Sequence, residues 1–197
     1  MPIDELARLV VRYRDSPSPM LQVEWALLRL LDATHCSMLQ NDLHEHASQW
    51  EVCAATGDLW KMLPDRPGLY MFVWRPPFGF QVAEGRRSGD LYQVLYVGQA
   101  GAGHGTTSTL RDRYKTYTRH IGGSADLLWQ RDEPISRASR LDRYLKLRPL
   151  EYWFTVVEDR AQIKLLEDRL LQLLNPPVNR DRRPRLVRGE PRPAFPR

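Results

Sequence analysis

The sequence predicts an α+β fold, in which three short strands and several helices follow a small helical segment. Three observations predict it. Apolar runs rich in aromatic and β-branched residues, each short enough for one strand, recur three times after residue 67. Longer stretches with apolar residues at helical spacing lie between and after these runs. A turn with two prolines at residues 64–67 separates this pattern from an earlier part in which only helices are expected.

Three helices are expected in the first part of the chain. The first spans residues 3–14, where apolar residues recur on one helical face. Residues 20–33 are almost wholly apolar, so a helix there is expected to be buried on most sides. A third helix is expected over residues 42–55, ending near Gly57.

Strands and helices are both expected in the second part. The three strands are expected at residues 69–74, 91–97 and 150–157. The three helices are expected at residues 109–121, 136–147 and 161–174. Asn175 and the two prolines after it end the last helix, because proline cannot continue a helix.

Composition predicts a cytoplasmic protein. The chain has 197 residues, 42% of them hydrophobic, which is enough for one compact core and a smaller appendage. No apolar run approaches the length of a membrane span, and the N-terminus lacks the pattern of a secretion signal. Cys36 and Cys53 are the only cysteines, so a reducing compartment fits better than a disulfide framework.

The charge is distributed unevenly. The formal net charge is +5, but residues 1–63 hold five basic and nine acidic side chains. Residues 180–197 hold seven arginines and two acidic residues among several prolines. We therefore expect an acidic helical N-terminal segment (1–63), a main domain (64–179) and a flexible Arg/Pro-rich tail (180–197). A polyanion would be attracted to the main domain and the tail.

Glu167 interrupts an apolar row in the predicted helix 161–174. Its neighbours along the row, Ile163, Leu170 and Leu174, are all apolar. A carboxylate on a face that packs inward needs an arginine, hydrogen-bond donors or a metal as its partner. The helix alone favours a buried ion pair.

The predicted helix 109–121 places Arg113 and Tyr117 one turn apart on a face that also carries Leu110. An ordinary amphipathic helix is the alternative, because tyrosine packs well at the edge of a core. Its other sides carry three cations that could contact phosphates. These are Arg111, Lys115 and Arg119.

Gly68-Leu69-Tyr70 and Tyr96-Val97-Gly98 resemble the two signatures of the GIY-YIG nucleases. After these signatures the family has an arginine and, one turn later, a tyrosine or histidine on a helix. It then has a glutamate on a helix and an asparagine beyond it. In this chain the corresponding residues occur in the same order, and Asn179 follows Glu167 by 12 positions. The resemblance covers residues 66–180 and implies a core with a small three-stranded antiparallel sheet flanked by helices.

The resemblance implies a set of catalytic residues. They are Tyr70, Tyr96, Arg113, Tyr117, Glu167 and Asn179. Glu167 would hold one Mg²⁺ or Mn²⁺ per active site, which would act as a Lewis acid. Arg113 would bind the scissile phosphate. Tyr96, or otherwise Tyr70, would be the base or position the water, and nearby cations would favour its phenolate.

The remaining two residues are given supporting roles by the same resemblance. Tyr117 would orient water or phosphate, and Asn179 would tie the site together by hydrogen bonds. The chain also departs from the family. Gln99 stands where a lysine is common, and residues 75–90 read as an insertion at the tip of the hairpin between the first two strands.

Further cations are candidate contacts to a nucleic-acid backbone. Four recur every three residues in the predicted helix 136–147, and others lie in the tail. They are Arg137, Arg140, Arg143, Lys146, Arg182, Arg183 and Arg185. A solvated basic helix face is the alternative. The glycine-rich loop 98–105 lacks the Gly-Lys-Ser/Thr ending, so no nucleotide cofactor is expected.

A zinc site in the N-terminal segment is a weaker alternative. Histidines and cysteines gather there, but no Cys-x-x-Cys pair occurs. They are His35, Cys36, His44, His46 and Cys53.

The resemblance implies a metal-dependent DNA endonuclease that leaves 5′-phosphate ends, and double-stranded DNA is the favoured substrate. The size of the chain favours a restriction-like or defence role, and DNA repair or cleavage of a particular DNA structure is the alternative. Gln99 favours a third hypothesis, in which the protein is a DNA-binding subunit whose catalysis is impaired. A homodimer would allow each site to cut one strand. The N-terminal segment would pack on the core, dimerise or recruit a partner.

Overall fold

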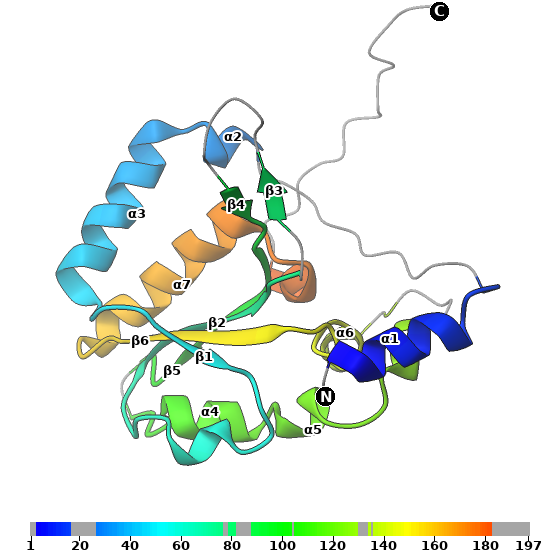
Figure 1. Ribbon diagram of the computed structural model, residues 1–197. Coiled ribbons are helices and arrows are strands. Elements are labelled where there is room, and N and C mark those ends of the chain that lie inside the picture. Colours follow the sequence, from blue (N-terminus) through cyan, green and yellow to red (C-terminus); the bar gives the residue numbers. More distant parts are fainter. Residues whose placement is uncertain are drawn as a thin grey trace, which may run out of the picture.

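The computed structural model describes residues 3–16, 27–76, 79–81, 88–103, 105–129, 134 and 136–182 (Figure 1). The first seven residues of the helix expected at 20–33 lie outside this part, and so do Arg183 and Arg185 of the tail. Within these ranges, no helix is both long and apolar enough to cross a membrane.

The core of the fold is a four-stranded antiparallel sheet with the order β1-β6-β2-β5. The strands are β1 (Glu51–Ala54), β2 (Gly68–Trp74), β5 (Gln93–Ala100) and β6 (Leu150–Val156). The predicted α+β class is therefore confirmed, and the three predicted strands are β2, β5 and β6. The expectation of three strands is wrong, because β1 adds a fourth at the edge beside β6.

β1 also corrects the helix predicted over residues 42–55. The helix α3 (Ala33–His46) ends at His46, and residues 51–54 form the strand instead. β1 is short and mostly exposed, so its side chains show no clear alternation of buried and exposed positions. Its conformation depends on pairing with β6, which is distant in sequence.

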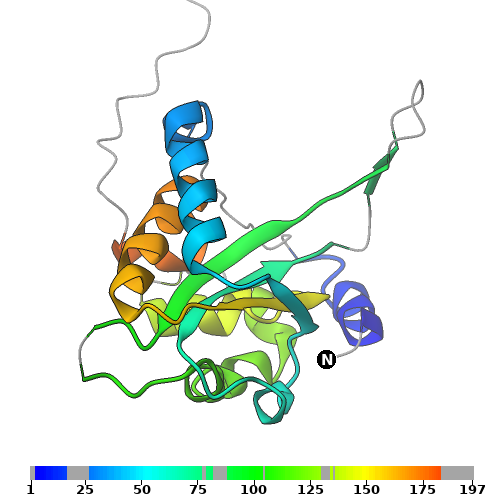
Figure 2. The same ribbon diagram turned by 90° about the vertical axis from the view of Figure 1, so that its left-hand side faces the viewer.

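The connection between β2 and β5 extends away from the sheet as a two-stranded ribbon (Figure 2). The ribbon consists of β3 (Gly79–Gln81) and β4 (Ser88–Asp90), which pair antiparallel. Because β2 and β5 are antiparallel neighbours, the ribbon is an insertion at the tip of their hairpin, as predicted.

Helices cover both faces of the sheet (Figure 1). On one face, α7 (Arg160–Leu174) packs against Leu69, Met71 and Val97, and α3 packs against α7. The opposite face carries Tyr70 and the aromatic residues around it. It is covered by α4 (Leu110–Lys115), α5 (Thr118–Ile121) and α6 (Arg137–Tyr144). Neighbouring residues of a strand alternate between these two layers.

The boundaries of these helices follow local signals. The single helix expected at 109–121 is in fact two, since α4 ends at Lys115 and α5 begins at Thr118. A capping box of Thr109 and Asp112 starts α4. α7 confirms the helix expected at 161–174, and its C-cap Asn175 is in the left-handed conformation with φ 43°. The short 3₁₀ helix η3 (Pro177–Arg182) follows α7.

The first helices pack on this core. α1 (Ile3–Arg12) lies beside the 3₁₀ helix η2 (Ala125–Trp129). Tyr13 stacks on Trp129 with ring centroids 4.9 Å apart, and its hydroxyl donates to Asp126 at 2.8 Å. α2 (Leu27–Leu30) contacts α3 and α7, and the 3₁₀ helix η1 (Leu59–Lys61) contacts α4. The N-terminal segment is thus part of the same packed structure.

Candidate active site

Three buried tyrosine hydroxyls meet between the sheet and its helices. The hydroxyls of Tyr70 and Tyr117 lie 2.7 Å apart, and the Tyr117 hydroxyl donates to that of Tyr96 at 3.2 Å. We call Tyr70, Tyr96 and Tyr117 the tyrosine triad. Its members come from β2, β5 and the junction between α4 and α5. The resemblance described above predicted that all three lie at one site, and the structure brings them together.

The register of the β2–β5 hairpin explains how two of these tyrosines meet. Tyr70 pairs with Gly98, and Phe72 pairs with Tyr96, so both tyrosines point to the same face. Gly98 is required for this arrangement. A Cβ atom at Gly98 would lie 2.5 Å from the hydroxyl oxygen of Tyr70, because the Tyr70 ring crosses this glycine. The glycine of the signature Tyr96-Val97-Gly98 therefore has a packing reason, in addition to the function that the resemblance implies.

Two arginines approach the triad from different helices. Arg137 of α6 donates to the Tyr96 hydroxyl and, at 3.1 Å, to the Tyr117 hydroxyl. Its guanidinium also lies over the Tyr96 ring, 5.1 Å from the ring centroid. Arg113 of α4 is half-buried beside Tyr70, which is its largest electrostatic influence and raises its pKa. No described residue accepts a hydrogen bond from the buried Nε of Arg113.

From the sequence, Arg137 was predicted only to contact a nucleic-acid backbone. Its spacing from other residues of the helix nevertheless indicates that it points inward. Arg137 lies one helical turn before Leu141 and two turns before Tyr144, and both of these residues are buried. Arg137 therefore lies on the packed side of α6.

Burial controls the protonation of two members of the triad. Desolvation raises the pKa of Tyr70 well above its ordinary value, and the neighbouring tyrosines add to the effect. Burial likewise raises the pKa of Tyr117, with a further contribution from Tyr96. Both side chains are therefore neutral phenols at neutral pH. For Tyr70, desolvation outweighs the opposing effect of Arg113 on the pKa, so this arginine by itself does not produce the phenolate that the resemblance implies.

Glu167 is fully buried on α7. This helix packs against Leu69 and Val97, on the face of the sheet opposite to the triad. Its carboxylate accepts a hydrogen bond from Lys164 at 3.3 Å. The described hydrogen bonds of the triad's hydroxyls run to one another and to Arg137, and none runs to Glu167.

The surroundings of Glu167 do not suit the expected metal. Mg²⁺ needs only one or two carboxylates but keeps several waters. Glu167 offers one carboxylate, yet its complete burial leaves no room for those waters, and the Lys164 ammonium already lies beside it. As arranged, these residues do not fit a bound divalent cation. Among the residues that the structure describes, no group of three or more His, Cys, Asp or Glu could hold a metal, including the five proposed for zinc.

Asn179 ties η3 to the edge of the sheet. Its Oδ1 accepts from the backbone N–H of Val97 at 2.9 Å, and its Nδ2 donates to the Val97 carbonyl at 2.8 Å. Asn179 therefore acts as the hydrogen-bond partner that β5 lacks on its outer side. Gln99 faces the α7 layer, since it pairs with Leu69, and its side chain accepts from the N–H of Ala102 at 3.0 Å.

Two of the four cations expected to contact a nucleic acid from residues 136–147 are buried instead. Arg140 and Lys146 are only 4% and 2% exposed. The Nε of Arg140 donates to the carbonyl of Val178 at 3.2 Å, and Lys146 donates to the carbonyl of Gly122. Backbone carbonyls at the ends of neighbouring helices thus hold these cations inside the fold.

The other cations proposed to contact a nucleic acid differ in exposure. Lys115 and Arg119 are exposed, and Lys115 lies 4.7 Å from the ring centroid of Trp60. Arg111 and Arg143 are half-buried, and Arg111 donates to the carbonyl of Leu63 at 3.0 Å. Lys115 and Arg119 are the members of this set whose charge faces solvent. The backbone of Arg182 ends η3.

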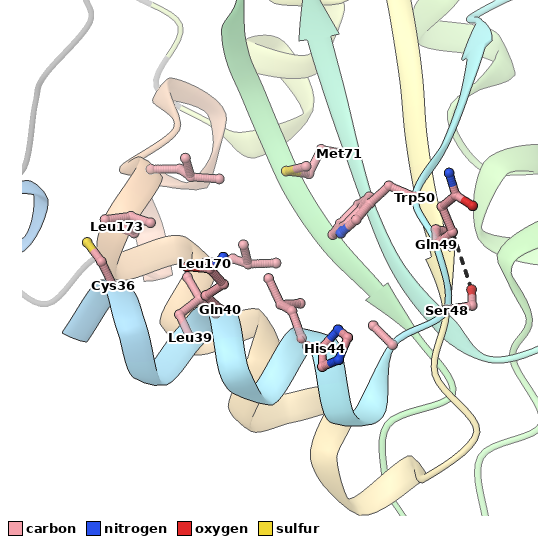
Figure 3. A pocket seen from close by; sticks show the side chains of 13 residues that line it. Cys36, Leu39, Gln40, His44, Ser48, Gln49, Trp50, Met71, Leu170 and Leu173 are labelled. Carbon is pink, nitrogen blue, oxygen red and sulfur yellow. Dashed lines mark hydrogen bonds between the residues drawn. The ribbon is translucent and has the colours of Figure 1, made fainter. Parts of the chain in front are cut away.

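A separate cavity of about 950 Å³ lies between α3, α7 and the chain leading into β1 (Figure 3). Its walls are mainly apolar and include Leu39, Trp50, Met71 and Leu170. Met71 and Tyr70 are neighbours on β2 and point to opposite faces. The cavity is therefore on the far side of the sheet from the triad. No residue of the predicted catalytic set lines it, whereas Cys36 and His44 of the candidate zinc group do.

Comparisons with known proteins add no further assignment. No protein-family model matches the chain, and neither a curated protein nor a solved structure does.

Proposed function

We propose that the protein is a DNA endonuclease that hydrolyses phosphodiester bonds at the tyrosine triad. One observation supports the proposal above the others. Tyr70, Tyr96 and Tyr117 come from separate elements, yet their hydroxyls form one hydrogen-bonded group with Arg113 beside it. These four residues belong to the catalytic set implied by the resemblance to the GIY-YIG nucleases. A chance occurrence of the two tripeptides would give no reason for this convergence.

The chemistry of the group suits a phosphate. The guanidiniums of Arg113 and Arg137 lie beside phenols, and Tyr70 and Tyr117 are neutral at neutral pH. A partly buried cation is stabilised by an anionic partner, and the forked donors of arginine match phosphate oxygens. Arg113 would bind the scissile phosphate, and Tyr96 would orient or deprotonate the attacking water. Glu167 as arranged does not fit the expected Mg²⁺ or Mn²⁺, which would need the side chains around it to rearrange, so no step here passes through a metal.

Double-stranded DNA is the proposed partner. The net charge is +5, and Lys115 and Arg119 are exposed on the helices that carry Arg113 and follow Tyr117. Exposed cations attract the phosphate backbone without regard to sequence. A restriction-like or defence role and a cytoplasmic location complete the proposal, with repair as its alternative.

A second candidate is a DNA-binding subunit that does not cleave. It is favoured by a specific observation, the complete burial of Glu167 against Lys164. A carboxylate held in this way cannot take part in metal binding unless the side chains around it rearrange.

Plasmid cleavage separates the two candidates. Purified protein would be incubated with supercoiled plasmid in Mg²⁺, Mn²⁺ or EDTA, beside the variants Arg113→Ala, Tyr96→Phe and Glu167→Gln. We expect nicked or linear product from the wild type and a loss of about 100-fold in Arg113→Ala, because one donor to the reacting phosphate is removed. Arg8→Ala, an exposed change on α1 with the same loss of charge, is the control and should cleave normally.

The outcomes are distinct. Cleavage that needs a divalent cation and is lost in Glu167→Gln would support the metal role of Glu167. Cleavage in EDTA would exclude it. Binding of DNA without cleavage of supercoiled, linear or single-stranded forms under any metal would overturn the endonuclease and leave the binding subunit.

A further inference from the structure

We propose that Arg137 is a second phosphate-binding residue of this site, so that the phosphate is held between Arg113 of α4 and Arg137 of α6. The identity of that phosphate as part of DNA rests on the proposed function. The presence of a two-arginine anion site does not, and it can be tested by itself.

The position of Arg137 is fixed by the fold. A capping box of Ser136 and Ser139 starts α6 at Arg137. One turn later, Arg140 anchors the helix to η3 through the carbonyl of Val178. The guanidinium is therefore held at the triad by the first turn of a helix that is capped at its start and anchored through Arg140.

Arg137 uses only part of its hydrogen-bonding capacity. One Nη donates to both the Tyr96 and Tyr117 hydroxyls, and no described residue accepts from its Nε or from the other Nη. The side chain is half-buried, so one part contacts the triad and another can face an incoming group. Arginine has five donors in a rigid fork, which is the geometry that binds phosphate in a bidentate manner.

The charge around the triad is unbalanced. Arg137 donates to tyrosine hydroxyls and Arg113 lies beside Tyr70, and among the described residues neither guanidinium forms an ion pair with a carboxylate. Tyr70 and Tyr117 remain neutral at neutral pH, so they cannot neutralise two guanidiniums. Two partly buried cations on one group of phenols favour the binding of an anion between them.

Strand β5 does not supply a competing cation. Gln99 points into the α7 layer and its side chain caps the loop at Ala102. The strand directs the side chain at position 99 away from the triad, so even a lysine at this position would not reach the hydroxyls. A cation on α6 can reach them. Arg137 therefore occupies the place where the site gains its second positive charge.

Anion binding tests the inference without any cleavage. The melting temperature of the wild-type chain would be measured in millimolar inorganic phosphate and in chloride at matched ionic strength. We expect phosphate to raise it by about 2–4 °C, because a ligand that binds only the folded state stabilises it. The rise should disappear in Arg137→Gln and in Arg113→Gln. It should persist in Arg8→Ala, and partly in Arg137→Lys, which keeps the charge but loses the fork.

Cleavage then tests the role in the reaction. With the enzyme saturating, Arg137→Gln should lower the rate of plasmid cleavage by about 100-fold and change the DNA affinity in EDTA by less than about threefold. The phosphate result decides the inference. An unchanged rise in Arg137→Gln overturns it, and so does the absence of any rise in the wild type. A rise that depends on Arg137 in a protein that cleaves no DNA keeps the anion site and removes the endonuclease.

If Arg137→Gln does not fold, Arg137→Lys takes its place. A phosphate-dependent rise in Arg137→Lys as large as that of the wild type would then overturn the inference, because the forked guanidinium would not be needed.

Discussion

Tyr114 of α4 and Tyr152 of β6 are buried in the same core layer, but only one of their hydroxyls has a partner among the described residues. The hydroxyl of Tyr114 donates to the carbonyl of Thr56 at 2.7 Å. No described residue forms a hydrogen bond with the hydroxyl of Tyr152, although its ring packs edge-on against Tyr114 with centroids 4.7 Å apart. The two phenols share an environment and differ in one hydrogen bond, so they form a natural pair for comparison.

This difference predicts opposite effects of the same substitution. Tyr152→Phe removes a buried, unpaired hydroxyl, so the free energy of unfolding should stay the same or rise by about 1 kcal/mol. Tyr114→Phe leaves the Thr56 carbonyl without its donor and should lower that free energy by about 1 kcal/mol. Urea denaturation of both variants and the wild type measures the effects. A clear loss of stability in Tyr152→Phe would show that its hydroxyl has a partner in solution.

At the scale of single elements, the strongest sequence patterns predicted the structure best. The apolar strands β2, β5 and β6 and the helix α7 lie where their patterns placed them. The spacing of their apolar residues indicates whether an element is buried on one face or on both, and this spacing can be seen within the element's own sequence. The meeting of Tyr70, Tyr96 and Tyr117 was also expected, but only because the order of the residues resembled a known family.

Elements that depend on distant contacts were not predictable. β1 becomes a strand through its pairing with β6, and its own side chains are too exposed to show a pattern. Arg140 and Lys146 have the spacing of a solvated face, but carbonyls at the ends of other helices accept their hydrogen bonds. Local sequence does not show which carbonyls will be left unpaired nearby. The apolar residues at helical spacing around Glu167 indicated that it is buried. They did not indicate that Lys164 would contact it.

Asn179 connects two elements, and its role can be isolated. It supplies one acceptor and one donor to the outer edge of β5 at Val97. Asn179→Ala should lower the free energy of unfolding by about 2–3 kcal/mol, because a buried N–H and a buried C=O both lose their partners. Asn179→Asp keeps the acceptor alone and should lose part of that amount.

Hydrogen exchange gives the local measurement for this prediction. The Val97 amide should be protected in the wild type and exchange faster in Asn179→Ala, while the Val73 amide on β2 serves as the comparison within the sheet. Equal protection of Val97 in both proteins would mean that Asn179 does not hold this edge.

At the scale of the whole molecule, both layers depend on residues before position 64. β1 covers the outer edge of β6, and α3 completes the layer that α7 begins. Leu39 and Leu63 are 3% and 1% exposed, and the Leu63 carbonyl accepts from Arg111 of α4. The sequence divides the chain at residue 63 by composition and charge, but the packing crosses that position on both faces of the sheet.

This packing predicts the outcome of truncation. A chain that begins at Pro64 loses β1, α3 and η1, and each buried leucine removed costs about 2–5 kcal/mol. Since a domain of this kind is stable by only about 5–15 kcal/mol, we expect the shortened chain to lack a cooperative thermal transition and a near-ultraviolet circular dichroism signal. A chain that begins at Leu27 is the control, because it loses α1 but keeps the sheet and α3. It should melt cooperatively at a lower temperature than the full chain, as the buried Leu9 and the stacking of Tyr13 on Trp129 are lost. If the chain from Pro64 instead melts cooperatively with the spectrum of the full protein, residues 64–179 form an independent domain, and β1 and α3 only decorate it.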